Sequence, residues 1–245
     1  MAVTEDQILS GRVRLRQASE GYRAGLDAAM LAAACDAGAG ARVFEAGCGV
    51  GAALLAAAWR QRDALFTGVE RDAATLDAAR ENVALNGLEA RVTVLGGDVT
   101  APFRSLGLAP FDAVMANPPY FDDAGALRGP AEAKQGAWIA DGGLGAWTGF
   151  LLNAARDGGS VTLIHRADRL GDILTLLAAK AGSFQIRPLH PFADAPAKRV
   201  VVRAIKRGKT PLRLLAPLIL HERGGAKHTA RAEAILRGDA RLEWM

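Results

Sequence analysis

The chain has 245 residues, half of them hydrophobic, which is enough to bury a substantial core in one large domain. No apolar run approaches the roughly 18 residues of a membrane span, and the first six residues lack the basic and then apolar order of a signal peptide. Two cysteines without CxxC or His-Cys spacing argue against a zinc site and a disulfide framework, so we expect a cytoplasmic protein with reduced thiols and no metal.

The formal net charge of +4 is unevenly distributed along the chain. Residues 1–184 hold 17 Lys+Arg against 21 Asp+Glu, whereas residues 185–245 hold 13 against 5. A basic cluster beside a nearly neutral body is typical of a phosphate-binding surface, so we expect a nucleic acid partner; a merely solvated face is the alternative. The expected RNA contacts are Lys198, Arg199, Arg203, Lys206, Arg207 and Lys209.

The predicted elements begin with a helix near Leu26–Cys35, which could pack over a ligand cleft. After it, short β-type runs alternate with amphipathic or alanine-rich stretches of helical length. Such alternation predicts a parallel sheet with helices on both faces, built through right-handed crossovers, with ligands bound at the carboxyl ends of the strands. Strands are expected at Arg42–Ala46, Leu65–Glu70, Arg91–Leu95 and Phe111–Ala116, and helices at about Gly51–Arg60 and Ala73–Leu85.

The second half of the chain completes this sheet. Residues 122–145, rich in Gly and Ala, are consistent with either a lid over a substrate or a disordered insertion. The last two β-type segments, Phe184–Leu189 and Val200–Ile205, are too close together for a crossover helix, so they predict an antiparallel pair. Before them we expect a helix around Ala146–Ala155, a strand at Ser160–Ile164 and a helix around Leu170–Ala179.

The first strand runs into Gly47-Cys48-Gly49-Val50-Gly51, where glycine lets the backbone turn tightly and approach a ligand closely. This motif alone is weak, because with Ala52 it also fits the dinucleotide pattern of a dehydrogenase. Three carboxylates, however, end three successive strands around it. Glu70 can accept from both ribose hydroxyls, Asp98 from an adenine amino group, and Glu45 suits an ammonium group better than a pyrophosphate.

These acids favour S-adenosylmethionine as the cofactor. The residues expected to bind it are Glu45, Gly47, Cys48, Gly49, Gly51, Glu70, Arg71, Asp98 and Val99.

Asn117-Pro118-Pro119-Tyr120 directly follows the apolar run 113–116 and is the expected catalytic group. Proline fixes φ and offers a carbonyl without an N–H, so Asn117 Oδ1 and the Pro118 carbonyl can both accept from one planar NH₂ group. Tyr120 can lie over the ring that carries this group. A proline-rich turn that only closes a strand is the alternative for these four residues considered alone.

The combined pattern resembles the class I S-adenosylmethionine-dependent methyltransferases that act on planar amino nitrogens through an NPPY motif, over about residues 40–206. Outside this core, Gly21-Tyr22-Arg23 with Asp27 near the start, and Lys198–Arg203 with Leu220–Glu222 near the end, resemble the bacterial family that methylates N6 of the adenine beside the anticodon of a valine tRNA. That family usually has Tyr-Thr where this chain has His228-Thr229.

The resemblance implies a Rossmann-like sheet of seven strands, mostly parallel with an antiparallel last strand and with helices on both faces. It implies an N-terminal cap over residues 1–38, a catalytic core over 39–206 and a basic extension over 207–245. Tyr22 and Arg23 would cap the cofactor or substrate, and the basic tail would hold tRNA.

Methyl transfer to an amine is an in-line displacement that needs positioning more than acid–base chemistry. Acceptors from Asn117 and Pro118 would localise the nitrogen lone pair and offset the positive charge that develops on it. Four alternatives remain open. Three of them are enzymes. One methylates a protein glutamine amide, which fits the same two acceptors, and another methylates guanine N2 in ribosomal RNA. The third is a nicotinamide dehydrogenase, which leaves Asn117–Tyr120 without a role. The fourth is a non-catalytic RNA-binding module on the same fold.

Overall fold

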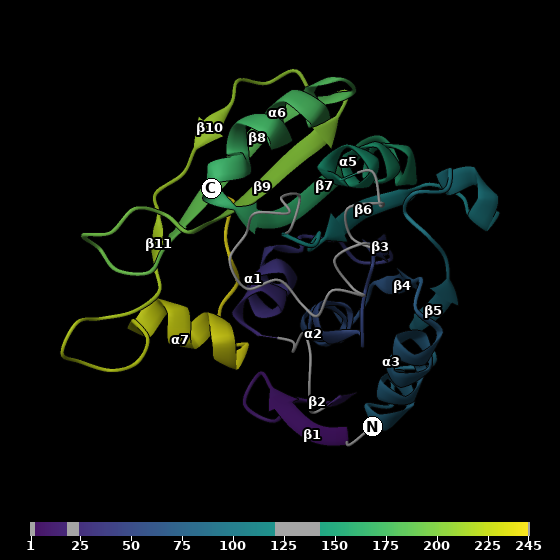
Figure 1. Cartoon of the computed structure of the whole chain (residues 1–245), viewed down its shortest axis with the longest axis horizontal. Coiled ribbons are helices and arrows are strands. Elements are labelled where there is room, and N and C mark those ends of the chain that lie inside the picture. The colour runs from purple at the N-terminus through teal and green to yellow at the C-terminus, as the bar shows by residue number, and fades with distance from the viewer. Residues whose placement is uncertain (1–2, 19–24, 121–142, 245) are drawn as a thin grey trace.

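The computed structural model describes residues 3–18, 25–120 and 143–244. Within these residues a nine-stranded sheet crosses the molecule in the order β10-β8-β9-β7-β6-β3-β4-β5, with β11 also paired to β8 (Figure 1). The strands are β3 (Arg42–Ala46), β4 (Leu65–Glu70), β5 (Val92–Gly96), β6 (Phe111–Ala116), β7 (Ala155–Arg166), β8 (Ala181–His190), β9 (Arg199–Lys206), β10 (Arg213–Leu214) and β11 (Leu218–Ile219).

The sheet is mostly parallel, and β9 is its antiparallel strand. β9 lies between β7 and β8 and runs antiparallel to both, whereas β10 and β11 add two short parallel pairings at the outer edge of β8. The seven longer strands with an antiparallel β9 therefore confirm the expected fold class and the expected antiparallel pair.

Helices cover both faces of the sheet because neighbouring residues along each strand point to opposite faces. In β3, Val43 belongs to one hydrophobic cluster and Phe44 to the other. The first cluster is covered by α1 (Leu26–Ala34), α2 (Ala52–Arg60), α3 (Ala73–Leu85) and α7 (Ala230–Arg237). The second is covered by α5 (Gly143–Ala154) and α6 (Leu170–Ala178), and two single turns, η1 (Phe103–Leu106) and η2 (Ala167–Arg169), border it.

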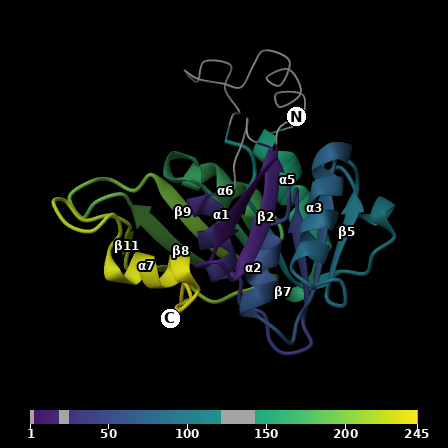
Figure 2. The same cartoon turned by 90° about the horizontal axis from the view of Figure 1, so that it is seen from below.

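An N-terminal hairpin of β1 (Val3–Ile8) and β2 (Val13–Ala18) runs across α2 and α3 (Figure 2). Two asparagines, Asn82 on α3 and Asn86 at its C-terminal cap, pair with the edge of β2 that β1 does not occupy. Asn86 Oδ1 and Nδ2 pair with the backbone N–H and C=O of Arg14 at 2.8 and 2.7 Å, and Asn82 pairs in the same way with Arg16 at 2.7 and 2.9 Å. The edge of β2 is thereby satisfied by side chains.

The elements from 42 to 206 agree with the prediction to within a few residues, except that β7 begins five residues earlier than Ser160. The helix expected near Leu26–Cys35 is present as α1 and packs mainly against α2. The hairpin, β10, β11 and α7 were not predicted. Within the described part of the chain, no helix has the length and apolarity that crossing a membrane requires.

Candidate active site

The expected site residues meet at the carboxyl edge of the sheet because their strands are neighbours. β3 pairs with β6 in parallel register, so Ala46 lies opposite Ala116. The residues that follow them, Gly47 and Asn117, therefore begin adjacent loops. On the other side of β3, β4 and β5 bring Glu70 opposite Gly96. The glycine turn and the NPPY segment thus share one edge, as the sequence predicted.

The glycine turn has left-handed backbone at its alternate positions. Gly47, Gly49 and Gly51 have φ of +61°, +56° and +89°, a region that side chains with a Cβ adopt only with strain. Among the described residues, a Cβ on Gly49 would meet nothing within 4 Å, so this glycine faces open space there. A Cβ on Gly47 would instead clash with the indole of Trp147, which covers the turn from α5.

Glu70 joins the end of β4 to the glycine turn. Its Oε2 accepts from the Gly49 N–H at 3.0 Å, and its Oε1 accepts from the backbone N–H groups of Arg71 and Asp72 at 2.9 Å. Asp98, after β5, accepts from the Thr100 N–H and hydroxyl at 2.8 Å and lies 3.9 Å from Arg71. Val99 beside it is partly buried against the second hydrophobic cluster.

Glu45 and Cys48 lie deeper. Glu45 is 2% exposed, and its Oε2 has no hydrogen-bond partner among the described residues. Burial raises the pKa of Glu45 well above its ordinary value, and the charge of Glu70 adds to this effect. Cys48 is also buried, and its Sγ would lie 2.9 Å from a Cβ on Gly68. The Cys48 side chain therefore occupies the space that a larger residue at position 68 would need. Only the backbone of Cys48 faces the inside of the glycine turn.

Asn117 and Tyr120 are held together after β6. The Tyr120 hydroxyl donates towards Asn117 Oδ1 at 3.0 Å and towards Asp27 Oδ2, on the first turn of α1, at 2.8 Å. The Arg199 guanidinium carbon lies 4.6 Å from the centre of the Tyr120 ring, and the His165 ring meets it edge-on at 5.0 Å. Pro118 between them is buried and Pro119 partly so.

The expected RNA contacts are divided between faces of the sheet, because β9 alternates. Arg199 pairs with Asp27 at 3.2 Å and Arg203 with Asp36 at 3.3 Å, both on the α1 side. Lys206 and Arg207 approach Asp157, at 3.8 and 3.2 Å, after the start of β7. Among the six, Lys198, Arg207 and Lys209 are exposed. RNA binding by these residues stays a prediction.

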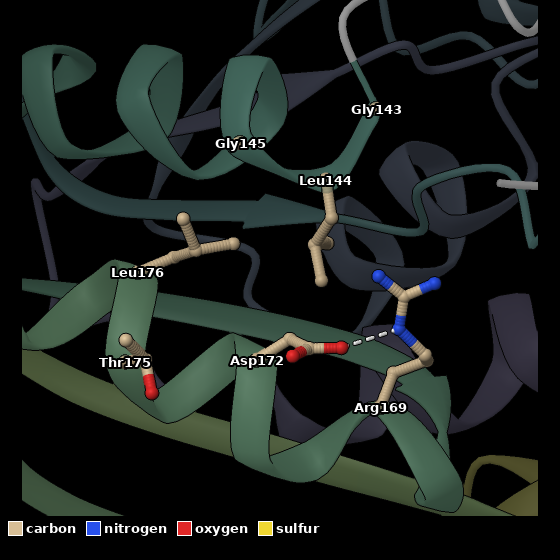
Figure 3. Close-up of a pocket in the computed structure, with 7 residues that line it drawn as sticks. All are labelled: Gly143, Leu144, Gly145, Arg169, Asp172, Thr175 and Leu176. Carbon is tan, nitrogen blue, oxygen red and sulfur yellow. Dashed lines mark hydrogen bonds and ion pairs between the residues drawn. The ribbon is translucent and has the colours of Figure 1, made fainter.

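Two predictions fall outside the described residues: Tyr22 and Arg23 as a cap, and most of the segment 122–145 as a lid. Residues 143–145, at the end of that segment, begin α5. A hollow of about 430 Å³ lies there, between the first turn of α5 and α6, next to the Arg169–Asp172 ion pair (Figure 3). None of the expected site residues lines it.

The structure adds three residues that sequence reasoning did not place at the site. These are Asp27, which was noted only as part of a resemblance, and His165 and Trp147. Trp147 is buried and also covers the glycine turn. Asp27 and His165 gave no local signal, because their relation to Tyr120 depends on strand order.

The decisive comparison is with protein families. Residues 23–129, which contain the glycine turn, Glu70, Asp98 and the NPPY segment, match the family model described as "Methyltransferase small domain". This part of the chain is similar to the methyltransferases that the family model describes. The prediction of a class I methyltransferase is therefore confirmed, and with it S-adenosylmethionine as the family's cofactor.

The curated relatives that this chain matches act on different substrates. The chain is 35% identical over 156 residues, 61% of its length, to a release factor glutamine methyltransferase of Moorella thermoacetica, of which the match covers 54%. It is 33% identical over 112 residues, 45% of its length, to a tRNA1(Val) (adenine(37)-N6)-methyltransferase of Aeromonas salmonicida, of which the match covers 46%. The chain thus spans about half the length of the curated relatives it matches.

A solved structure gives a fuller match. A predicted O-methyltransferase of Agrobacterium tumefaciens superposes with a TM-score of 0.74 at 29% identity, over 88% of this chain and 98% of that one. The agreement extends beyond residues 23–129, so the C-terminal strands belong to the same fold in both proteins.

The residues of the candidate site fit S-adenosylmethionine. The buried Glu45 oxygen without a partner suits an ammonium group, and the open space at Gly49 allows a ligand to approach the backbone. The Glu70 carboxylate, which already links the turn to β4, lies where ribose hydroxyls could donate to it.

Proposed function

We propose that this protein is an S-adenosylmethionine-dependent N-methyltransferase that methylates an exocyclic amino nitrogen, N6 of an adenine near the anticodon of a tRNA. The observation that carries the proposal is the parallel register of β3 and β6. Because Ala46 lies opposite Ala116, the next residues along the two strands, Gly47 and Asn117, begin adjacent loops. A nitrogen held by Asn117 would thus be close to a methyl group bound over the glycine turn.

The cofactor supplies an electrophilic methyl group on a sulfonium. The residues of this chain would hold the acceptor nitrogen in line with it. Asn117 Oδ1 and the Pro118 carbonyl would accept from the two N–H groups, which localises the nitrogen lone pair and stabilises its developing charge. Transfer of this methyl group to the nitrogen would leave the electron pair of the S–C bond on the cofactor's sulfur. The nitrogen then loses one proton to solvent.

Adenine in tRNA is favoured by the similarity to the Aeromonas enzyme and by the basic C-terminal region. An adenine must leave its stack to reach Asn117, which costs a few kcal/mol that phosphate contacts and aromatic stacking can offset. Four of the six basic residues form ion pairs within the protein: Arg199, Arg203, Lys206 and Arg207. We therefore expect the phosphate contacts to come from Lys198 and Lys209, whose side chains are exposed.

The second candidate is methylation of a protein glutamine amide. The longer match to the Moorella enzyme favours it, and a planar amide NH₂ fits the same two acceptors.

The test is to incubate the protein with labelled S-adenosylmethionine and, separately, total tRNA, rRNA and protein extract, and to identify the product by mass spectrometry. N6-methyladenine in tRNA is the expected result. Label in a glutamine side chain, in guanine or on an oxygen would overturn the adenine assignment. Asn117→Ala should bind the cofactor and lose turnover, whereas Glu70→Ala should mainly weaken cofactor binding; wild-type turnover by Asn117→Ala would refute the mechanism.

A further inference from the structure

Two elements far apart in the sequence, α1 and β9, converge on the Tyr120 side chain. Asp27 on α1 accepts from its hydroxyl at 2.8 Å, and Arg199 at the start of β9 lies over its ring and bonds to the same Asp27 oxygen at 3.2 Å. Both side chains are partly buried, with 15% of the Asp27 side chain and 31% of the Arg199 side chain exposed. These contacts span 93 and 172 residues of sequence, so they are tertiary contacts and not features of a local turn.

The Tyr120 hydroxyl carries one proton and lies within hydrogen-bond distance of Asp27 Oδ2, at 2.8 Å, and of Asn117 Oδ1, at 3.0 Å. An ionised carboxylate is the stronger acceptor, since hydrogen bonds to charged groups are shorter and about twice as strong as neutral ones. Arg199 pairs directly with this carboxylate, Nε to Oδ2, at 3.2 Å. In return, although burial opposes it, the charge of Asp27 raises the pKa of Arg199. The proton of Tyr120 therefore goes to Asp27.

We propose that Asp27 is a positioning residue for catalysis: by taking the Tyr120 proton, it leaves a lone pair of Asn117 Oδ1 to accept from the substrate amine. The inference rests on the proposed function, because it assigns Asn117 to the substrate. Without the Asp27 carboxylate, the phenol would donate to Asn117 and compete with the substrate N–H for the same oxygen.

The test is a double-mutant cycle of Asp27→Asn and Tyr120→Phe, with kcat, KM and cofactor affinity measured for each variant on the substrate identified above. Asp27→Asn should lower kcat about tenfold while the calorimetric affinity for S-adenosylmethionine stays within about twofold. In the Tyr120→Phe background the hydroxyl is absent, so Asp27→Asn should change kcat by less than about twofold.

A purely structural role of Asp27, such as holding Arg199, predicts the same loss of kcat in both backgrounds, and that result would overturn the proposal. Unchanged kcat in the Asp27→Asn single variant would overturn it too. Thermal unfolding of all four proteins separates loss of fold from loss of positioning.

A spectroscopic arm distinguishes failure of this inference from failure of the proposed function. The chain has two tyrosines, so Tyr22→Phe leaves Tyr120 as the sole phenol. Ultraviolet titration at the phenolate band should show that Asp27→Asn makes Tyr120 ionise at lower pH, because the carboxylate charge that opposes phenolate is gone. An unchanged titration refutes the Asp27 contact itself. A shifted titration in a protein that methylates no substrate supports the contact and refutes the proposed function.

Discussion

Gly47 offers a quantitative test of the packing around the cofactor turn. Two terms act on Gly47→Ala. Its φ of +61° costs a residue with a Cβ roughly 1–2 kcal/mol. The new methyl group would also lie 2.9 Å from Trp147 Cζ3 and closer still to Cη2, and overpacking of this kind costs roughly 1–3 kcal/mol. The expected loss of unfolding free energy is therefore about 2–5 kcal/mol.

Gly87 provides a matched control. Its φ of +63° is nearly the same, but a Cβ there would meet nothing within 4 Å. Gly87→Ala should therefore cost only the backbone term, roughly 1–2 kcal/mol. Reduced conformational entropy of the unfolded chain offsets part of the cost in both variants alike, so the difference between them isolates the clash with Trp147.

The assay is urea denaturation followed by far-ultraviolet circular dichroism, with slopes compared to check that unfolding stays two-state. Adding Trp147→Leu should relieve the clash, so the double variant with Gly47→Ala should be more stable than the sum of the single effects by about 1 kcal/mol or more. Equal losses in Gly47→Ala and Gly87→Ala, or additive effects with Trp147→Leu, would refute this account of the turn.

Three further predictions concern other parts of the molecule. Burial raises the pKa of Glu45, so the apoprotein should lose stability as the pH rises from 4.5 through that pKa. The affinity for the cofactor should instead rise with pH, until the cofactor's own ammonium group deprotonates. Calorimetry in buffers of different ionisation enthalpy should detect release of a proton on binding, and this release should be absent in Glu45→Gln. Asn82→Ala should cost roughly 2–4 kcal/mol, because it leaves the backbone of Arg16 and the Val50 carbonyl without their amide partners, while the more exposed Asn86→Ala should cost about 1 kcal/mol in the same denaturation assay. Thr229→Ala should cost about 1 kcal/mol by removing the N-cap that accepts from the Ala232 N–H, and Thr229→Ser should restore it; equal stability of Thr229→Ala and wild type would contradict the capping role.

The core of the fold could be predicted from the sequence because its signals are local. Alternating β runs and helical stretches from residue 42 to 206 give both the element type and the parallel order. The N-terminal hairpin was missed although Val13, Leu15 and Gln17 alternate with Arg14 and Arg16, a period of two. β2 packs against α2 and α3, and nothing local indicates that Asn82 and Asn86 pair with β2.

The candidate site was predictable to a similar extent. Glycines and acids that end successive strands can be recognised from their spacing in the sequence, because parallel strands bring their carboxyl ends to one edge of the sheet. The partners of Tyr120 could not be found in this way, because Asp27 and Arg199 reach it only through the packing of α1 and the insertion of β9 beside β7. The charge count likewise identified a basic region, but the alternation of β9 and the acids at Asp36 and Asp157 decide which charges are exposed.

The placement of β9 has a consequence for the order in which the protein becomes competent during synthesis. The cofactor turn and the NPPY segment leave the ribosome first, yet Arg199, which pairs with Asp27 beneath Tyr120, belongs to one of the last long strands. A nascent chain ending before residue 206 could bury much of its first helices but would lack the strand that positions this arginine. The contacts of Arg199 with Asp27 and Tyr120 therefore form only after nearly the whole sheet has been synthesised.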